Sequence, residues 1–177
     1  MKTKLRGGSN HWSLISLNVN RLNSPIKRHR LTFWIWKQNP SFFCIQETHL
    51  NLKDRHHLRV KGWEKIYRSN GPKKQAGVAI LISNKIDFKL KSVKRNKEGY
   101  FILITGKIYQ EKISILNIYA PNTRAPSYVK ETLPKLKSYI KPHILIVGDF
   151  NTPLYPIDMS TRQKPNREIR EVMEVMN

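Results

Sequence analysis

The sequence predicts a single α/β domain in which short strands alternate with a few helices. Three observations support this prediction: apolar runs of strand length bounded by turn residues, three segments with helical apolar spacing, and the absence of repeats, linkers or low-complexity tracts. Hydrophobic residues make up 39% of the 177 residues and aromatic residues 10%, so the chain can build a core.

The first part of the chain contains two short strands around one helix. Ser13–Leu17 is an apolar run that ends at Asn18, and Phe42–Gln46 is a second run of strand length. Between them, Ser24-Pro25 is a typical helix start, a capping residue followed by proline at the first helical position. We expect this helix to cover residues 26–38 and to bury Ile26, Leu31, Trp34 and Ile35.

The middle of the chain predicts an antiparallel meander, because strand-like runs follow one another with turn residues between them. The runs are Gly77–Ile82, Phe88–Val93, Tyr100–Ile108 and Ile113–Tyr119.

Two helices and one strand are expected in the last part of the chain. Tyr128–Ile140 has helical periodicity, although Pro134 should kink or break that helix at a cost of about 3 kcal/mol. His143–Val147 is predicted as a fully buried strand that leads into Gly148-Asp149. An amphipathic helix is predicted from the spacing of Ile169, Val172, Met173 and Met176.

Charge is the strongest compositional signal, with 33 Lys and Arg against 12 Asp and Glu and a net charge of +21. The basic residues are spread along the chain, which favours a folded protein with a basic face and a polyanionic partner. No apolar run approaches the roughly 18 residues needed to cross a membrane, and no signal peptide is recognisable. Cys44 is the single cysteine, so disulfides and thiolate zinc sites are excluded, and we expect a nuclear or cytoplasmic protein that is not secreted.

Acidic residues are scarce, and two of them directly follow predicted buried strands. Glu47 and Asp149 stand at the carboxyl ends of such strands, where side chains from neighbouring strands can converge in a crevice. Two carboxylates suit a hard divalent ion such as Mg²⁺, with Mn²⁺ as an alternative, because Mg²⁺ keeps water and substrate phosphates as its other ligands. Asn18 and Asn151 would supply amide groups beside them, but solvated loop residues would show the same spacing.

Four segments occur in the order of the successive motifs of a known superfamily. They are Leu17–Asn20, Gln46–His49, Asn117–Pro121 and Gly148–Pro153. Together they resemble the endonuclease/exonuclease/phosphatase superfamily, which includes DNase I and the apurinic endonucleases. Within it, three further segments resemble the endonuclease domain that opens the second open reading frame of mammalian LINE retrotransposons: Ser24–Arg30, Ala76–Leu81 and Asn151–Leu154.

The resemblance implies a DNase I-like fold, a β-sandwich of two sheets flanked by helices. It runs from residue 12 to residue 177 and corresponds to the N-terminal part of such a domain, with residues 1–11 as a basic N-terminal segment. We therefore expect a C-terminally truncated domain with an incomplete second sheet. The strand that ends at Asp149 would then have an unpaired edge.

The resemblance also implies a role for each candidate residue. Glu47 matches the carboxylate that binds Mg²⁺, and Asn18 matches the amide beside it. Tyr119 matches the tyrosine that orients the scissile phosphate. Asp149 matches the acid that handles proton transfer, and Asn151 matches the amide that steadies the phosphate oxyanion. The family reaction hydrolyses one DNA strand and leaves a 3′-hydroxyl, which in LINE elements primes reverse transcription.

Two departures from the family pattern bear on activity. The family uses a late Ser-Asp-His segment as general base, and this sequence contains no Asp-His dipeptide. Because general acid–base catalysis contributes roughly 10²–10⁴ in rate, we expect little or no activity. Arg21 stands where the family usually has glycine, and a left-handed backbone there would cost about 1–2 kcal/mol.

Two other interpretations remain open beside the endonuclease fragment. One is a non-catalytic nucleic-acid binder whose aromatic residues stack on bases among basic residues, with Trp34, Trp36, Trp63 and Tyr67 as candidates. The other is a remnant without function. The expected partner is DNA, with RNA as a second polyanion, and neither a membrane nor a specific protein partner is inferred.

Overall fold

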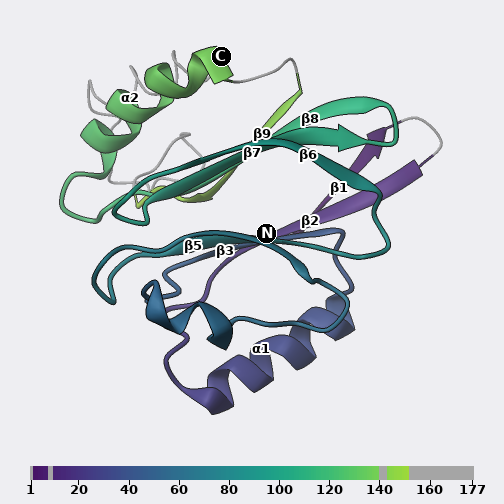
Figure 1. Ribbon diagram of the computed structural model, residues 1–177. Coiled ribbons are helices and arrows are strands. Elements are labelled where there is room, and N and C mark those ends of the chain that lie inside the picture. Colours follow the sequence, from purple (N-terminus) through teal and green to yellow (C-terminus); the bar gives the residue numbers. More distant parts are fainter. Residues whose placement is uncertain (1, 8–9, 140–142, 152–177) are drawn as a thin grey trace, which may run out of the picture.

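The computed structural model describes residues 2–7, 10–139 and 143–151, and these residues form two facing β-sheets with helices on the outside (Figure 1). The first sheet has five strands in the order β1-β2-β3-β5-β4, and the second has four in the order β6-β7-β8-β9. This arrangement is the two-sheet α/β sandwich that the sequence predicts.

The strands of the first sheet are β1 (Lys2–Gly7), β2 (Asn10–Asn18), β3 (Phe42–Gln46), β4 (Lys65–Ser69) and β5 (Val78–Ile82). Those of the second sheet are β6 (Phe88–Arg95), β7 (Phe101–Ile108), β8 (Glu111–Tyr119) and β9 (Ile144–Asp149). The α-helices are α1 (Pro25–Gln38) and α2 (Ala125–Leu136), and the short 3₁₀ helices are η1 (Lys53–His57) and η2 (Lys137–Tyr139).

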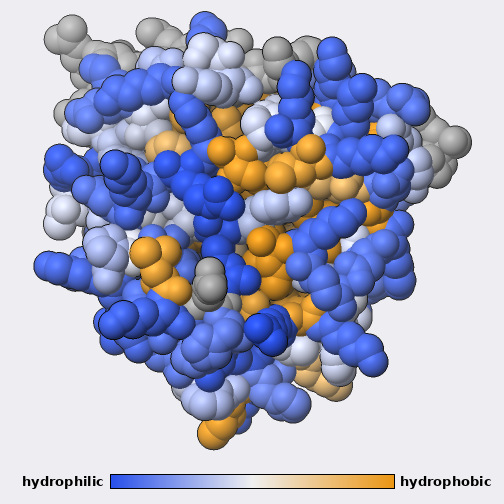
Figure 2. All heavy atoms as spheres, viewed as in Figure 1, coloured by the Kyte–Doolittle hydropathy of each residue, from blue (hydrophilic) through white to orange (hydrophobic). Residues whose placement is uncertain are grey.

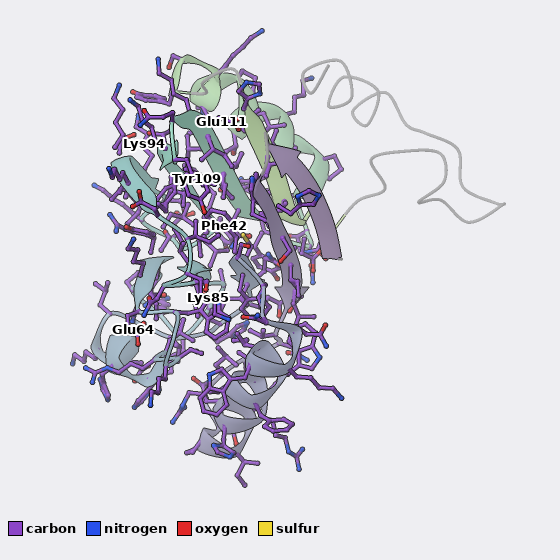
Figure 3. The ribbon with its side chains drawn as sticks, turned by 90° about the vertical axis from the view of Figure 1, so that its right-hand side faces the viewer. Phe42, Glu64, Lys85, Lys94, Tyr109 and Glu111 are labelled. Carbon is purple, nitrogen blue, oxygen red and sulfur yellow. The ribbon has the colours of Figure 1, made fainter. Side chains whose placement is uncertain are left out.

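Three hydrophobic clusters fill the layers of the sandwich. The first lies between the sheets and includes Phe42, which Figure 3 shows between them. The second joins α1 to the first sheet, and the third joins α2 to the second sheet. β3 is buried on both faces: Phe42 packs between the sheets, while its neighbour Phe43 packs toward α1.

The helices differ from the sequence prediction in two respects. Leu31 and Ile35 of α1 are buried, but Ile26 is 67% exposed, so its predicted burial is wrong. Ile26 lies nine residues from Ile35, which at 3.6 residues per turn places it on the opposite side of the helix. In α2, Pro134 is accommodated near the end of the helix, after which the chain continues as η2.

The strand β9 is less buried than predicted. Each of its six residues is partly exposed, because β9 pairs only with β8 among the described residues and so lies at the edge of its sheet. The prediction of a fully buried strand is therefore wrong, although Leu145 and Val147 pack against the core between the sheets. The helix predicted from Ile169 to Met176 lies outside the described residues.

The surface agrees with the basic composition. On the face shown in Figure 2, hydrophilic residues cover most of the surface, and hydrophobic residues show mainly toward the middle. None of the helices in the described part of the chain is both long and apolar enough to span a membrane.

Strand direction determines where functional side chains can gather. β2 runs parallel to β3 with Asn18 opposite Gln46, and β8 runs parallel to β9 with Tyr119 opposite Asp149. In each sheet, therefore, the two strands of one parallel pair end at the same edge.

Two buried amides join the sheets close to these strand ends. Asn117 of β8 donates from Nδ2 to the carbonyl oxygens of Ile45 (3.0 Å) and Ala79 (2.9 Å) in the first sheet. Its Oδ1 accepts a hydrogen bond of 2.7 Å from Gln46 Nε2, which also donates to Ser16 Oγ at 3.1 Å. Both amides are almost completely buried, so these bonds hold the two sheets in one relative position.

Replacing the bridging amide should destabilise the fold. Asn117→Ala removes one acceptor of the buried Gln46 amide and the donor to the Ile45 and Ala79 carbonyl oxygens, so we expect the free energy of unfolding to fall by about 1–3 kcal/mol. Urea denaturation measures this change, with the exposed residue Asn122 replaced by Ala as the control. A loss no larger than in the Asn122→Ala control would contradict this role of the bridge.

Candidate functional site

The candidate site lies where β2, β3 and β9 end. Asn18 is the last residue of β2, Glu47 directly follows β3, and Asp149 is the last residue of β9. The Asn18 Nδ2 group donates to Glu47 Oε1 at 3.0 Å and to Asp149 Oδ2 at 2.7 Å. One amide nitrogen therefore joins two carboxylates that come from different sheets.

The backbone around Glu47 is held in an unusual conformation. Glu47 has a φ of 55° and Arg21 a φ of 69°, both in the left-handed region. The Arg21 N–H donates to the Glu47 carbonyl at 2.7 Å, and the Leu22 N–H donates to that of Thr48 at 2.9 Å. Arg21 therefore has the left-handed backbone that the sequence suggested. Two backbone hydrogen bonds, from Arg21 and Leu22, connect this segment to the Glu47 loop.

Gly77, directly before β5, supports the same loop. Gly77 has a φ of +91°, and a Cβ atom added there would lie 2.2 Å from Thr48 Oγ1. Its carbonyl oxygen accepts a hydrogen bond of 3.1 Å from the Thr48 N–H. Only a glycine allows this close approach, which holds the residue next to Glu47.

Tyr119 lies opposite Asp149 at the end of β8, and its ring stacks on that of Tyr100 with centroids 6.2 Å apart. Burial raises the pKa of Tyr119 above its usual range, and the hydrogen bond to the Glu47 carboxylate and the negative charges of Glu47 and Asp149 raise it further. Its hydroxyl therefore stays protonated and can donate a hydrogen bond.

Asn151 lies beside this group, but its side chain is bound elsewhere. Its backbone N–H donates to Asp149 Oδ1 at 3.1 Å, whereas its Nδ2 group donates to the Ala120 carbonyl oxygen at 2.6 Å. The structure thus gathers Asn18, Glu47, Tyr119 and Asp149 in one place, and Asn151 shapes the Asp149 side of it.

His49 lies two residues after Glu47, and the sequence did not favour it as a general base because no carboxylate was expected to orient it. Its Nε2 atom lies 3.6 Å from Glu47 Oε2, and its side chain is only 16% exposed. Both residues have left-handed backbones, with φ values of 52° and 55°, in an irregular segment where simple strand alternation does not apply. Such local geometry cannot be read from spacing alone.

The ligands available fit a hard divalent ion. Glu47 and Asp149 supply carboxylate oxygens within reach of a single amide nitrogen. Among the described residues, no group of three or more His, Cys, Asp or Glu side chains is placed so that it could hold a metal ion. Zinc sites use three or four protein ligands, whereas Mg²⁺ is bound through one or two carboxylates and retains water, so the pair suits Mg²⁺ or Mn²⁺.

The raised pKa of Tyr119 should make stability fall at alkaline pH. The folded state holds the phenol proton more tightly than the unfolded state, in which tyrosine ionises near pH 10. The stabilisation is therefore complete below about pH 10 and is lost as the pH rises above it. In thermal melts between roughly pH 9 and 11, wild type should lose more stability than Tyr119→Phe. Parallel losses in the two proteins would contradict this assignment.

The sequence matches the Endonuclease/Exonuclease/phosphatase family over residues 15–169. It is 27% identical over 166 residues to a DNA-(apurinic or apyrimidinic site) endonuclease of Dictyostelium discoideum, a match that covers 85% of this chain and 44% of that protein. The chain thus spans less than half the length of this curated relative.

Solved structures show the same fold. An AP endonuclease from Archaeoglobus fulgidus has a TM-score of 0.67 at 20% identity, over 92% of this chain and 68% of that one. The AP endonuclease LMAP from Leishmania major has a TM-score of 0.68 at 16% identity, over 92% of this chain and 64% of that one. The family match covers most of the chain, and the chain belongs to the Endonuclease/Exonuclease/phosphatase family.

Proposed function

We propose that the strand-end site is the metal- and phosphate-binding part of a LINE-type DNA endonuclease. The observation that supports this best is the Asn18 amide that joins the carboxylates of Glu47 and Asp149. The segments Ser24–Arg30, Ala76–Leu81 and Asn151–Leu154 favour the LINE type within the family. DNA is the proposed substrate, in the nucleus or cytoplasm, and the +21 net charge suits such a polyanion.

The proposed chemistry divides among the gathered side chains. Glu47, with Asp149 nearby, would hold Mg²⁺ or Mn²⁺, and a divalent ion there supplies charge that neutralises a phosphodiester and activates water. Asn18 keeps the two carboxylates in position through its hydrogen bonds. Tyr119 keeps its proton and donates it to a phosphate oxygen in a hydrogen bond, which orients the phosphate.

Asp149 is the proposed group for proton transfer at the reacting oxygen. The Asn151 N–H holds Asp149 Oδ1, while Asp149 Oδ2 accepts from Asn18. Asn151 remains the candidate for steadying the phosphate oxyanion, which requires its Nδ2 group to leave the Ala120 carbonyl. Cleavage of one DNA strand would leave a 3′-hydroxyl, the end from which a LINE-type element starts reverse transcription.

We further propose that these 177 residues have little or no DNA-cleaving activity. The sequence has no Asp-His dipeptide, and His49 already lies beside the carboxylate of Glu47. Without a general base, roughly 10²–10⁴ in rate is lost, although the metal and phosphate contacts persist.

A second candidate function is cleavage at abasic sites. The relative from Dictyostelium discoideum, 27% identical, bears the name of an apurinic or apyrimidinic site endonuclease. Substrate preference separates the two candidates, because the first requires cleavage of intact DNA and the second requires cleavage at abasic sites.

Nicking of supercoiled plasmid tests the proposal, with Mg²⁺ or EDTA and with Glu47→Ala, Asp149→Ala and the exposed control Glu131→Ala. We expect little or no nicking, and any nicking that occurs should require Mg²⁺, be lost in both site variants and persist in the control. Mn²⁺ binding followed by electron paramagnetic resonance gives a second readout, and Asn18→Ala should weaken it by about 10- to 100-fold.

Three results would contradict the proposal in different ways. Nicking that is unaffected in both carboxylate variants would place the chemistry elsewhere. Mn²⁺ binding that is unchanged in Glu47→Ala would exclude the metal site. A strong preference for an abasic duplex over an intact one would favour the second candidate function over the LINE type.

A further inference from the structure

Three lysines form a row across the second sheet. Lys89 of β6 lies directly opposite Lys107 of β7, which lies directly opposite Lys112 of β8. All three are exposed. Residues that face each other across neighbouring strands project from the same face of a sheet, so the three ammonium groups share one side.

The row lies on the outer face of the sandwich. In β7, Ile104 and Ile108 pack between the sheets, whereas Leu103 packs toward α2, and Lys107 has the same parity as Leu103. Helix α2 covers other residues of this outer face, among them Leu116 and Ile118 of β8.

The lysine row is remote from the candidate site. Lys112 and Tyr119 lie near opposite ends of β8, roughly 23 Å apart at the rise of an extended strand. Figure 3 shows Tyr109, in the turn between β7 and β8, at the level of the second sheet and above Phe42 of the core. Contacts at the row therefore cannot be contacts with the Asn18–Glu47–Asp149 group.

Little in the described structure compensates this charge. Lys89 Nζ lies 3.9 Å from Asp87 Oδ2, and both side chains are largely exposed. Lys107 and Lys112 form no ion pair with any carboxylate that the structure describes. Like charges placed directly opposite each other destabilise a sheet, so an anionic partner along the row would relieve repulsion.

The chemistry of the exposed side chains indicates the kind of partner. Ser92, Thr105 and Ser114 occupy the next positions on this face, where Ser92 is exposed but Thr105 and Ser114 are buried, so only Ser92 reaches the surface there. Surfaces that bind membranes carry apolar side chains for the acyl boundary, whereas the three exposed positions of the row carry ammonium groups. A second copy of this chain, also strongly basic, would be repelled.

We propose that the outer face of β6, β7 and β8 binds the phosphate backbone of nucleic acid. Strands lie about 4.8 Å apart, so the lysines present a line of positive charges to a polymer that is itself a line of negative charges. Tyr109 is 46% exposed in the turn between β7 and β8, two residues after Lys107, and offers a ring on which a base can stack. The inference rests on the proposed function only in that both take nucleic acid as the ligand.

The salt dependence of binding tests this surface. A labelled DNA duplex is titrated by fluorescence anisotropy in EDTA, with Glu47→Ala as the background so that cleavage plays no part. The triple variant K89Q/K107Q/K112Q is compared with K37Q/K53Q/K61Q, which removes the same charge from exposed positions outside the second sheet. Lys→Arg changes at all three row positions serve as the conservative variant, and thermal melts verify folding.

We expect the slope of log K against log salt to become shallower by about 2–3 in the row variant, since each phosphate contact contributes roughly 0.9. The control triple should change the slope by less than about 1, and the Lys→Arg triple should bind like the background. Equal effects of the row and control triples would overturn the proposal, because the attraction would then be diffuse.

Two further arms identify the ligand and separate the proposals. Single-stranded RNA replaces the duplex in one arm, where a row-dependent slope of about 0.7 per contact would also support backbone binding. Anionic phospholipid vesicles replace it in the other, and row-dependent binding of vesicles but not of nucleic acid would overturn the inference. A chain that does not nick DNA can still show the salt dependence that the lysine row predicts. A chain whose salt dependence does not involve the row can still nick DNA at the candidate site.

Discussion

The hydrogen bonds of Asn117 with Gln46, Ile45 and Ala79 are the constraint on which the candidate site depends. They join the first sheet to β8 inside the core, where an unpaired amide would be costly, so the two sheets meet in one arrangement near their strand ends. Glu47 follows Gln46 directly, and Tyr119 lies two residues after Asn117. The bridge therefore positions one residue from each sheet, and β9, paired in register with β8, adds Asp149.

The same convergence creates an electrostatic conflict within a basic protein. Two carboxylates share the Asn18 amide as donor in a chain of net charge +21. Its lysines and arginines attract phosphates, whereas Glu47 and Asp149 repel a phosphate at close range. A divalent cation between them would reconcile the two effects, because it binds both the carboxylates and the phosphate oxygens. On this view the basic surface concentrates nucleic acid, and the strand ends select where a phosphodiester is held.

Strand ends and their polar residues could be predicted from the sequence because burial leaves a local signature. The apolar runs before Asn18, Glu47 and Asp149 mark strands, and parallel strands place such residues at one edge. Features that depend on sheet packing or on unusual backbone conformation left no such signature. The bridge through Asn117 depends on how the sheets face each other, and the contact of His49 with Glu47 depends on left-handed backbone. β1 and β4 were missed because charged residues interrupt them, and pairing with β2 and β5 supplies their order.

The convergence of Asn18, Glu47 and Asp149 on one metal site is tested most directly by paramagnetic broadening with Mn²⁺. The broadening is observed in the NMR spectrum of protein labelled with ¹⁵N-asparagine. The Asn18 side-chain amide is assigned with Asn18→Ala, and Asn39, whose Oδ1 accepts from the Lys85 ammonium group, serves as the reference. We expect substoichiometric Mn²⁺ to broaden the Asn18 signal well before that of Asn39, and Glu47→Ala to abolish the difference. Equal broadening of both signals, or broadening at Asn18 that persists in Glu47→Ala, would contradict a metal site between the strand ends.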